Sequence, residues 1–275
     1  MRLPPLACSV RRCTLPLVRR ERTMVCPAGH SYDVARSGYV NLLQPQDRRS
    51  AAAGDSSEAI DARESLLASG VGRTLINALT TRIRSLDLED DPIVVDLGCG
   101  SGDALAALTA HGTSVGIGID LSTPAIERAS RRFPDRTWVV ANADRRLPLL
   151  DRSVDVVSSV HARRNPPEVA RVLHETGSLL VAVPAADDLI QLRELVHGQR
   201  VERDRGEIVL AEHETLFELV ERSVVREMQD LDRDALLSVL RGTYRGMRRG
   251  VADRVAALTR MTVTFASEIL MFRLR

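Results

Sequence analysis

Three glycines at alternate positions, Gly98, Gly100 and Gly102, lie in the segment VVDLGCGSGD at residues 94–103. The segment begins like a buried strand and continues into a run typical of a helix. Glycine has no Cβ and tolerates positive φ, so a ligand can lie against backbone N–H groups where the helix starts. The pattern indicates a loop for a nucleotide-like ligand, although a G-x-G sequence alone also occurs in ordinary tight turns.

Carboxylates accompany this loop on three consecutive predicted strands. Asp96 lies inside the first strand, where a carboxylate needs a polar partner, and Asp120 ends the second, where it would accept hydrogen bonds from ribose hydroxyls. Asp144 ends the third strand and is placed to face an adenine. Dinucleotide sites share this layout but have GxGxxG spacing, so the GxGxG spacing with Asp96 favours S-adenosylmethionine. The predicted donor contacts are Asp96, Gly98, Cys99, Gly100, Ser101, Gly102, Asp120, Leu121 and Asp144, with Cys99 as a small filling residue.

A second group of reactive side chains lies near the N-terminus. The spacing Cys8-x4-Cys13-x12-Cys26-x3-His30 supplies three thiolates and one imidazole, the Cys3His set of a closed structural zinc site. Residues 1–36 show no long amphipathic period that could build a core, so a metal would stabilise this segment. Isolated reduced cysteines are the alternative. The surrounding arginines, which could contact RNA phosphates or simply face solvent, are Arg11, Arg12, Arg19, Arg20 and Arg22.

The composition limits the class of protein. A net charge of +1 argues against a protein that holds nucleic acid by bulk charge alone. No apolar run reaches the roughly 20 residues of a membrane span, and the N-terminus lacks the apolar stretch of a signal peptide. Four cysteines in a chain of 275 residues are not a disulfide framework. We therefore expect a cytoplasmic protein that does not associate with membranes.

The elements that must position these residues alternate along the chain. The pattern is helical from Ser57 with a pause at Gly70–Gly72, and after Pro92 apolar strands alternate with helices. Such alternation predicts a parallel sheet covered on both faces. Strands are predicted at 93–98, 114–120, 137–144, 154–160 and 178–184, and helices at 103–111, 123–133, 166–174 and 187–198. Two β-branched runs at 223–231 and 261–275 predict a final antiparallel pair at the sheet edge.

Both ends of the chain together resemble one family. The segments CPAGHSYDVARSGYVNLL (26–43), GDSSEAIDAR (54–63), LLASG (66–70), VVDLGCGSG (94–102) and HARRNPPEVARVL (161–173) occur in this order. They are similar to the RlmA/TlrB-type 23S ribosomal RNA guanine-N1 methyltransferases, the last segment especially to the macrolide-resistance branch. The resemblance spans nearly the whole chain.

The resemblance implies an α/β fold of the class I, Rossmann-like, S-adenosylmethionine-dependent methyltransferases, with a mostly parallel seven-stranded sheet. It also implies a zinc-binding domain at 1–36, a linker and helical segment at 37–90 and a methyltransferase domain at 91–275. The expected activity is methylation of guanine N1 in a 23S rRNA hairpin. The resemblance also implies a homodimer and a link to resistance against ribosome-targeting antibiotics. A diverged enzyme acting on a small molecule, or a non-catalytic paralogue that binds donor or RNA, are the alternatives.

The acceptor should lie beyond the C-terminal ends of the central strands. There His161 is the best-placed base to deprotonate guanine N1, a structural histidine being the alternative, and Ala162, Arg163 and Asn165 would line the acceptor site. Tyr244 stands where the family usually has a tryptophan. Other departures from the family pattern are Gly72 in place of an aromatic, Asp188 in place of a histidine, and Ala162-Arg163 in place of Ala-Pro. They leave the fold prediction intact and concern the donor and acceptor pocket.

Overall fold

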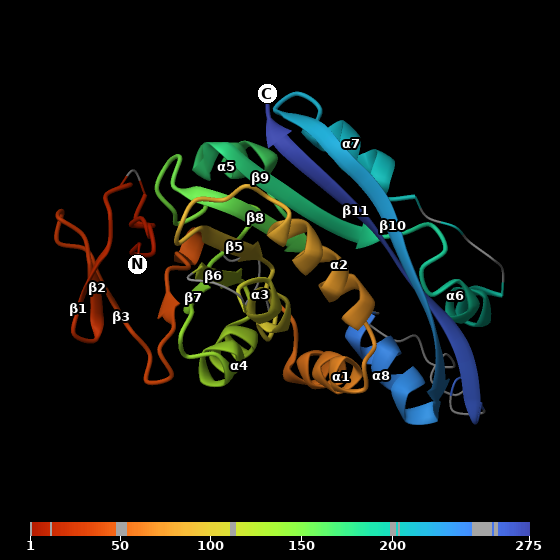
Figure 1. Ribbon diagram of the computed structural model, residues 1–275. Helices are drawn as coiled ribbons and strands as arrows, with labels where there is room; N and C mark the ends of the chain where they lie inside the picture. Colours follow the sequence, from red (N-terminus) through yellow and green to blue (C-terminus); the bar gives the residue numbers. More distant parts are fainter. Residues whose placement is uncertain are drawn as a thin grey trace.

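A central eight-stranded sheet organises the chain, with the strand order β10-β11-β9-β8-β5-β6-β7-β4 (Figure 1). The six strands from β9 to β4 run parallel, and β11 and β10 add an antiparallel pair at one edge. This arrangement confirms the predicted α/β architecture and its antiparallel ending. The computed structural model describes residues 2–11, 13–47, 54–110, 114–198, 202, 204–243, 255 and 258–275. The strands of the sheet are β4 (Val40–Asn41), β5 (Ile93–Leu97), β6 (Val115–Asp120), β7 (Thr137–Val140), β8 (Val154–Val160), β9 (Leu173–Pro184), β10 (Phe217–Asp232) and β11 (Arg260–Leu274).

The prediction of seven strands was wrong by one, because β4 joins the sheet beside β7. Val40 and Asn41 pair in parallel with Val139 and Val140, and the pairing buries Val40. Two residues are too few to show the alternation that marks a strand in a sequence. The segment that follows the predicted zinc ligands therefore closes the far edge of the sheet.

Alternating side chains divide the core between the two faces of the sheet, as expected of pleated strands. Ile93, Val95 and Leu97 of β5 belong to one buried cluster, and Val94 belongs to the other. Helices α2, α3 and α4 cover the Val94 face, whereas α5 and α7 pack on the opposite face. The helices are α1 (Ser57–Ala68), α2 (Arg73–Arg84), α3 (Asp103–Leu108), α4 (Thr123–Arg132), α5 (Pro166–Val172), α6 (Ile190–His197), α7 (Gly206–His213) and α8 (Arg233–Thr243), with a short 3-10 turn at Pro45–Asp47.

The N-terminal lobe, residues 2–39, forms a small antiparallel sheet of β1 (Val18–Arg20), β2 (Thr23–Val25) and β3 (Ser31–Asp33). Figure 1 shows it beside the β4 and β7 edge of the main sheet. The first residues of the lobe are bound to the segment after β7. The N–H of Ala7 donates to the Pro148 carbonyl at 2.9 Å, and Leu6 pairs with Leu149. Leu6 is buried there, so the lobe shares a core with the larger part of the chain.

Candidate functional site

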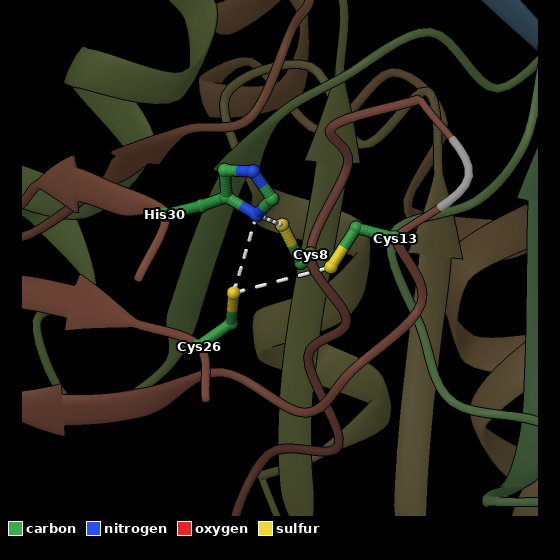
Figure 2. Close-up of side chains that lie close together, drawn as sticks. All are labelled: Cys8, Cys13, Cys26 and His30. Carbon is green, nitrogen blue, oxygen red and sulfur yellow. Dashed lines mark hydrogen bonds between the residues drawn. The ribbon is translucent and has the colours of Figure 1, made fainter. Parts of the chain in front are cut away.

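The four predicted metal ligands converge in the N-terminal lobe (Figure 2). The Nδ1 atom of His30 lies 3.5 Å from the Sγ atom of Cys8 and 3.4 Å from that of Cys26, and the Cys13 and Cys26 sulfurs are 3.9 Å apart. All four ligand atoms lie within 4.8 Å of one another. A tetrahedral zinc ion with its usual bond lengths separates such ligands by roughly 3.5–3.8 Å. The cluster therefore has the dimensions of a structural zinc site.

Local hydrogen bonds prepare the cluster for a metal. The knuckle closes on itself because the Cys26 N–H donates to the His30 carbonyl at 3.0 Å. Burial opposes ionisation of the Cys26 thiol, but hydrogen bonds from the N–H groups of His30 and Ala28 outweigh it and lower the pKa to about 7. The Tyr32 hydroxyl lies 3.1 Å from the Cys8 sulfur and accepts hydrogen bonds from the N–H groups of Ser9 and Val10. The contacts of Cys26 therefore favour its thiolate. Burial raises the pKa of the Cys8 thiol, although the hydrogen bond with Tyr32 opposes the rise.

The glycine loop lies between β5 and α3 and is closely packed on two sides. Gly98 has a φ of 71°, and a Cβ there would collide with the Cβ of Ala162. Gly102 has a φ of 85°, and a Cβ there would collide with the buried indole of Trp138. Because both positions combine positive φ with a close approach, only glycine fits them without strain. Gly100, between them, has no such neighbour on its Cβ side, which leaves the backbone open where a ligand would lie.

Asp120 connects the glycine loop with the start of α4. Its Oδ2 atom accepts a hydrogen bond from the Gly100 N–H at 2.9 Å, and its Oδ1 atom accepts one from the Ser122 N–H at 2.8 Å. Burial raises the pKa of Asp120, and the two N–H donors oppose this rise. Leu121 lies half-buried beside it. Asp120, the carboxylate that the sequence predicts to bind the donor ribose, is therefore held against the glycine loop.

Asp96 is almost completely buried, with 1% of its surface exposed. The Ser158 hydroxyl donates a hydrogen bond to its Oδ1 atom at 2.6 Å, which supplies the polar partner that an in-strand carboxylate needs. Burial, with a smaller contribution from the charge of Asp120, raises its pKa from 3.8 to about 7. The same burial raises the pKa of the Cys99 thiol well above its usual value, so Cys99 is a neutral thiol at physiological pH.

We expect Asp96→Asn to stabilise the ligand-free protein at alkaline pH. A native pKa of about 7 means that Asp96 keeps its proton between pH 4 and 7 while the unfolded chain releases it. Its contribution to stability is thus fully present near pH 4 and falls by roughly 4 kcal/mol as the pH rises through 7. Asparagine can still accept from Ser158 without that cost. Urea unfolding at pH 5 and pH 8 measures this, with the exposed Asp90→Asn as control; equal effects at both pH values would contradict the assignment.

The sequence did not single out Asp55, although the structure places it near Asp120 and the glycine loop. Its carbonyl accepts a hydrogen bond from the Ser122 hydroxyl at 2.9 Å, and its carboxylate pairs with Arg63 of α1. Its negative charge is one reason for the raised pKa of Asp120. The only signal was its place in the family-like segment GDSSEAIDAR. Asp55 thus joins α1 to the edge of the predicted donor site.

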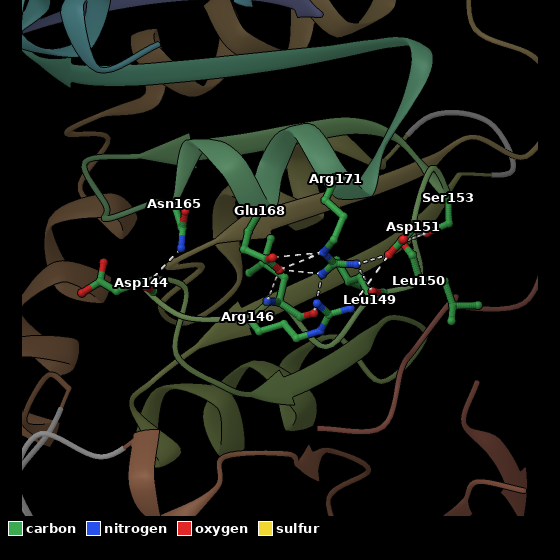
Figure 3. Close-up of polar contacts among 10 residues, drawn as sticks. Asp144, Arg146, Leu149, Leu150, Asp151, Ser153, Asn165, Glu168 and Arg171 are labelled. Atoms are coloured by element: carbon green, nitrogen blue, oxygen red, sulfur yellow. Dashed lines mark hydrogen bonds and ion pairs between the residues drawn. The ribbon is translucent and has the colours of Figure 1, made fainter. Parts of the chain in front are cut away.

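Residues 161–165, here called the acceptor loop, lie between β8 and α5. Ala162 packs on Gly98, and Arg163 donates to the Asp144 carboxylate at 3.2 Å. Figure 3 shows the Asn165 side chain donating to the Asp144 carbonyl, at 3.3 Å. The structure therefore brings Asp144, Ala162, Arg163 and Asn165 together beside the glycine loop, and their roles in binding donor and acceptor stay predictions.

Figure 3 also shows how α5 fixes the segment that follows Asp144. The Glu168 carboxylate accepts a hydrogen bond from the Leu147 N–H at 2.9 Å, and the Arg171 guanidinium donates to the Leu147 and Leu149 carbonyls at 2.9 Å each. Glu168 and Arg171 also form an ion pair at 2.6 Å. The segment is therefore rigidly held between the acceptor loop and the N-terminal lobe.

His161 has an unusual backbone for a residue other than glycine, with a φ of 52°. Its N–H donates to the Ala182 carbonyl at 2.8 Å, and its Nε2 atom lies 2.9 Å from the Ser267 hydroxyl. The residue is exposed to solvent, yet the protein around its ring and the positive charge of Arg205 lower its pKa to about 4. The imidazole is therefore neutral at physiological pH.

The residues that depart from the family pattern have structural partners. The Gly72 N–H donates to the Glu227 carboxylate of β10 at 2.8 Å, where α2 begins. The Asp188 carboxylate accepts from the Ala266 N–H at 3.0 Å, and burial raises its pKa to about 6. Ser101, another predicted donor residue, is buried and donates to Asp103 at 2.7 Å. Tyr244 lies outside the described residues.

None of the helices in the described ranges combines the length and apolar character needed to cross a membrane.

Comparisons with known proteins agree with both parts of this arrangement. A family model for the RlmA N-terminal zinc ribbon matches residues 7–51, and a model for a methyltransferase domain matches residues 94–182. The structure of the YcgJ protein from Bacillus subtilis resembles the fold with a TM-score of 0.52 at 18% identity, covering 72% of this chain and 98% of that one. This likeness concerns the fold alone.

Two curated relatives cover most of the chain. The 23S rRNA (guanine(748)-N(1))-methyltransferase of Streptomyces fradiae is 39% identical over 82% of this chain and 80% of its own length. A protein of Micromonospora griseorubida, provisionally named as a 23S rRNA (guanine-N(1)-)-methyltransferase, is 36% identical over 98% of both chains. Identity at this level over more than two thirds of each chain defines a common family. The chain belongs to the 23S rRNA guanine-N1 methyltransferase family, as an S-adenosylmethionine-dependent enzyme with an N-terminal zinc ribbon.

Proposed function

We propose that this enzyme transfers a methyl group from S-adenosylmethionine to N1 of a guanine in a 23S rRNA hairpin. The observation that carries the proposal is the packing of Ala162 directly on Gly98, because residues 161–165 thereby lie against the glycine loop. The names of the two curated relatives, which match most of the chain, support the choice of acceptor.

The donor supplies an activated methyl group on a sulfonium, so the protein has mainly to align the two reactants and exclude water. We propose that the glycine loop and Asp120 hold the donor and that Ala162, Arg163 and Asn165 hold the base. With a pKa of about 4 and a hydrogen-bond partner in Ser267, His161 would be a weak base. We therefore propose that His161 shapes the acceptor site and that the N1 proton passes to solvent.

The N-terminal lobe supplies the positive charge that an RNA partner requires. Residues 1–39 contain seven arginines and two acidic residues, whereas the whole chain has a net charge of +1. Positive charge is thus concentrated in the lobe, and electrostatic attraction to phosphates depends on such local concentration. The arginines that the structure shows exposed there are Arg11, Arg19, Arg20, Arg22 and Arg36.

A groove between the lobe and the segment after β7 extends this surface toward the donor loop. Ser9 and Leu42 line one side of it, and Asn142, Arg145 and Arg146 line the other. None of the described residues that line it is acidic, and the exposed Arg145 guanidinium has no protein partner in the described part of the chain. We propose that RNA phosphates bind in this groove while the target base reaches the acceptor loop.

Replacing both Arg145 and Arg146 by alanine should lower the affinity for RNA. It should also make this affinity less sensitive to the salt concentration. Each phosphate contact to single-stranded RNA contributes about 0.7 to the slope of log affinity against log salt, so the slope should fall by about 1.4. Filter binding of a 23S rRNA hairpin between low and moderate salt measures the slope. The control is Arg131→Ala, which removes an exposed side chain of α4 and should leave the slope as in the wild type. An unchanged slope in the double variant would exclude the groove from the RNA path.

The proposed function is tested by the transfer of labelled methyl groups. The protein, with S-adenosylmethionine labelled in its methyl group, is incubated with a large-subunit rRNA hairpin, with intact 23S rRNA and with free guanosine. We expect label in the RNA samples only. Label in guanosine alone would indicate a small-molecule enzyme, and tight donor binding without any transfer would indicate a non-catalytic protein.

We also propose that two copies associate through β10. This strand ends the sheet order, and Val220, Val224 and Met228 are exposed along it. Long edge strands with exposed apolar side chains readily pair with another strand. Sedimentation equilibrium should give twice the 30.2 kDa of the chain, and Met228→Lys should reduce this association.

With ribosomal RNA as acceptor, we place the enzyme in the cytoplasm, which cell fractionation can test.

A further inference from the structure

Two neighbouring arginines of the acceptor loop have opposite environments. The side chain of Arg163 is 77% exposed, whereas that of Arg164 is only 6% exposed. A guanidinium remains charged at all physiological pH values, and burying it is costly unless its N–H groups find partners. Arg164 therefore cannot reach RNA phosphates, and its burial requires another explanation.

The three nitrogens of the Arg164 guanidinium face three partners on two segments, its own loop and the end of α7. Nε donates to the Nε2 atom of His213 at 3.3 Å, and Nη1 donates to the carbonyl of Ala162 at 3.3 Å. Nη2 lies 3.6 Å from the carboxylate of Glu212. The guanidinium group of Arg164 thus joins the acceptor loop to the end of α7, a helix from a later part of the chain.

His213 is a rigid acceptor for this arginine. It is completely buried, its Nδ1 atom lies 2.7 Å from the Val209 carbonyl, and its ring stacks on Phe272 of β11 at 5.1 Å. Because Nδ1 must donate to that carbonyl, Nε2 carries the free lone pair that accepts from Arg164. Burial lowers the pKa of His213 to about 4, which keeps the imidazole neutral and this lone pair available.

The carbonyl that Arg164 holds belongs to the residue in contact with the donor loop. Ala162 packs so closely on Gly98 that a Cβ on Gly98 would collide with it. The preceding residue, His161, has a strained positive φ, which persists only where the surroundings enforce it. The hydrogen bond from Arg164 to the Ala162 carbonyl acts immediately after this strained position.

We propose that Arg164 is a positioning residue for methyl transfer, which holds the Ala162 carbonyl and so fixes the acceptor loop against Gly98. It acts through Ala162 and touches neither donor nor acceptor, whereas Arg163 is the arginine of the loop that meets the acceptor. The inference rests on the proposed function for the identity of the acceptor. Lysine cannot replace Arg164, because a single ammonium cannot serve partners in three directions.

Steady-state kinetics of Arg164→Lys test this role. Misplacement of a reacting group by about 1 Å can cost roughly 100-fold in rate, so we expect kcat for rRNA methylation to fall by about 10- to 100-fold. The KM for RNA and the donor Kd should change by less than about threefold, because Arg164 contacts neither ligand. Arg163→Ala should show the opposite split, with a higher KM for RNA. A kcat for Arg164→Lys within about twofold of the wild-type value would overturn the proposal. So would a kcat that falls only in proportion to the fraction of the variant that is folded.

A second variant and a second measurement keep the test decisive. His213→Phe preserves the ring stacking on Phe272 but removes the acceptor for Arg164, and it should lower kcat in the same way. Hydrogen exchange of the backbone amides at residues 159–165 should become faster in both variants, while exchange in β5 and β6 stays as in the wild type. Unchanged exchange in the loop would overturn the positioning role. Faster exchange with no methylation of RNA by the wild type would instead place the failure in the proposed function.

Discussion

Replacing Asp120 by alanine should weaken the binding of S-adenosylmethionine by about 100-fold, which corresponds to about 2.7 kcal/mol. The carboxylate accepts hydrogen bonds from the N–H groups of Gly100 and Ser122, and it thereby holds the glycine loop to the start of α4. Hydrogen bonds to a charged group contribute roughly 1.5–3 kcal/mol each, and those to the donor ribose would be lost as well. Titration calorimetry measures the affinity.

The indole of Trp138 offers an independent readout, because it is the only tryptophan and lies against Gly102 of the donor loop. Its fluorescence should respond to the donor in the wild type and only at much higher concentrations in Asp120→Ala. Asp120→Asn should show an intermediate loss, since the amide keeps one acceptor. The control is Glu127→Gln, a change at a solvent-exposed side chain of α4, the helix that follows Asp120. If Asp120→Ala binds the donor within about fivefold of the wild type, Asp120 does not hold the ribose.

Cys26→Ser should remove zinc from the protein and unfold the N-terminal lobe. Cys26 is buried, lies 3.4 Å from the Nδ1 atom of His30 and 3.9 Å from the sulfur of Cys13, and closes the knuckle through its backbone. A structural zinc ion contributes on the order of 10 kcal/mol to the folding of a small domain. The variant should contain much less than the expected one zinc ion per chain, as measured by mass spectrometry of the metal content.

The fourth cysteine provides a matched control for this experiment. Cys99 is also buried and reduced, but it lies in the glycine loop, away from the metal cluster. Cys99→Ser should therefore keep its zinc. Limited proteolysis should cut Cys26→Ser within residues 2–39 while the sheet stays resistant, and rRNA methylation should fall with the loss of the arginine-rich surface. Retention of zinc by Cys26→Ser would exclude the site formed by these four residues.

The sequence was informative where local pattern and chemistry coincide. The alternation of apolar strands and helices after Pro92 predicted the parallel sheet, and the helix predicted at 123–133 is α4 in the structure. The four ligands were found because cysteine and histidine spacing limits how they can converge. The break at Gly70–Gly72 correctly separated α1 from α2.

Features that depend on contacts between distant segments were missed. The two residues of β4 become a strand only because β7 lies beside them, and the helix α7 carries no periodic pattern of its own. Nothing in the sequence distinguishes Arg163 from its neighbour Arg164. Only the position of His213, 49 residues further along, separates the buried arginine from the exposed one.

The measurement that tests the central claim most directly is reverse transcription of 23S rRNA after treatment with the enzyme. A methyl group on N1 occupies the Watson–Crick edge of guanine, so primer extension should stop next to one guanine of a hairpin loop. We predict a single new stop that requires the wild-type enzyme and S-adenosylmethionine and that disappears with Asp120→Ala. Labelled rRNA without any new stop would place the methyl group elsewhere, and rRNA with neither label nor stop would contradict the account as a whole.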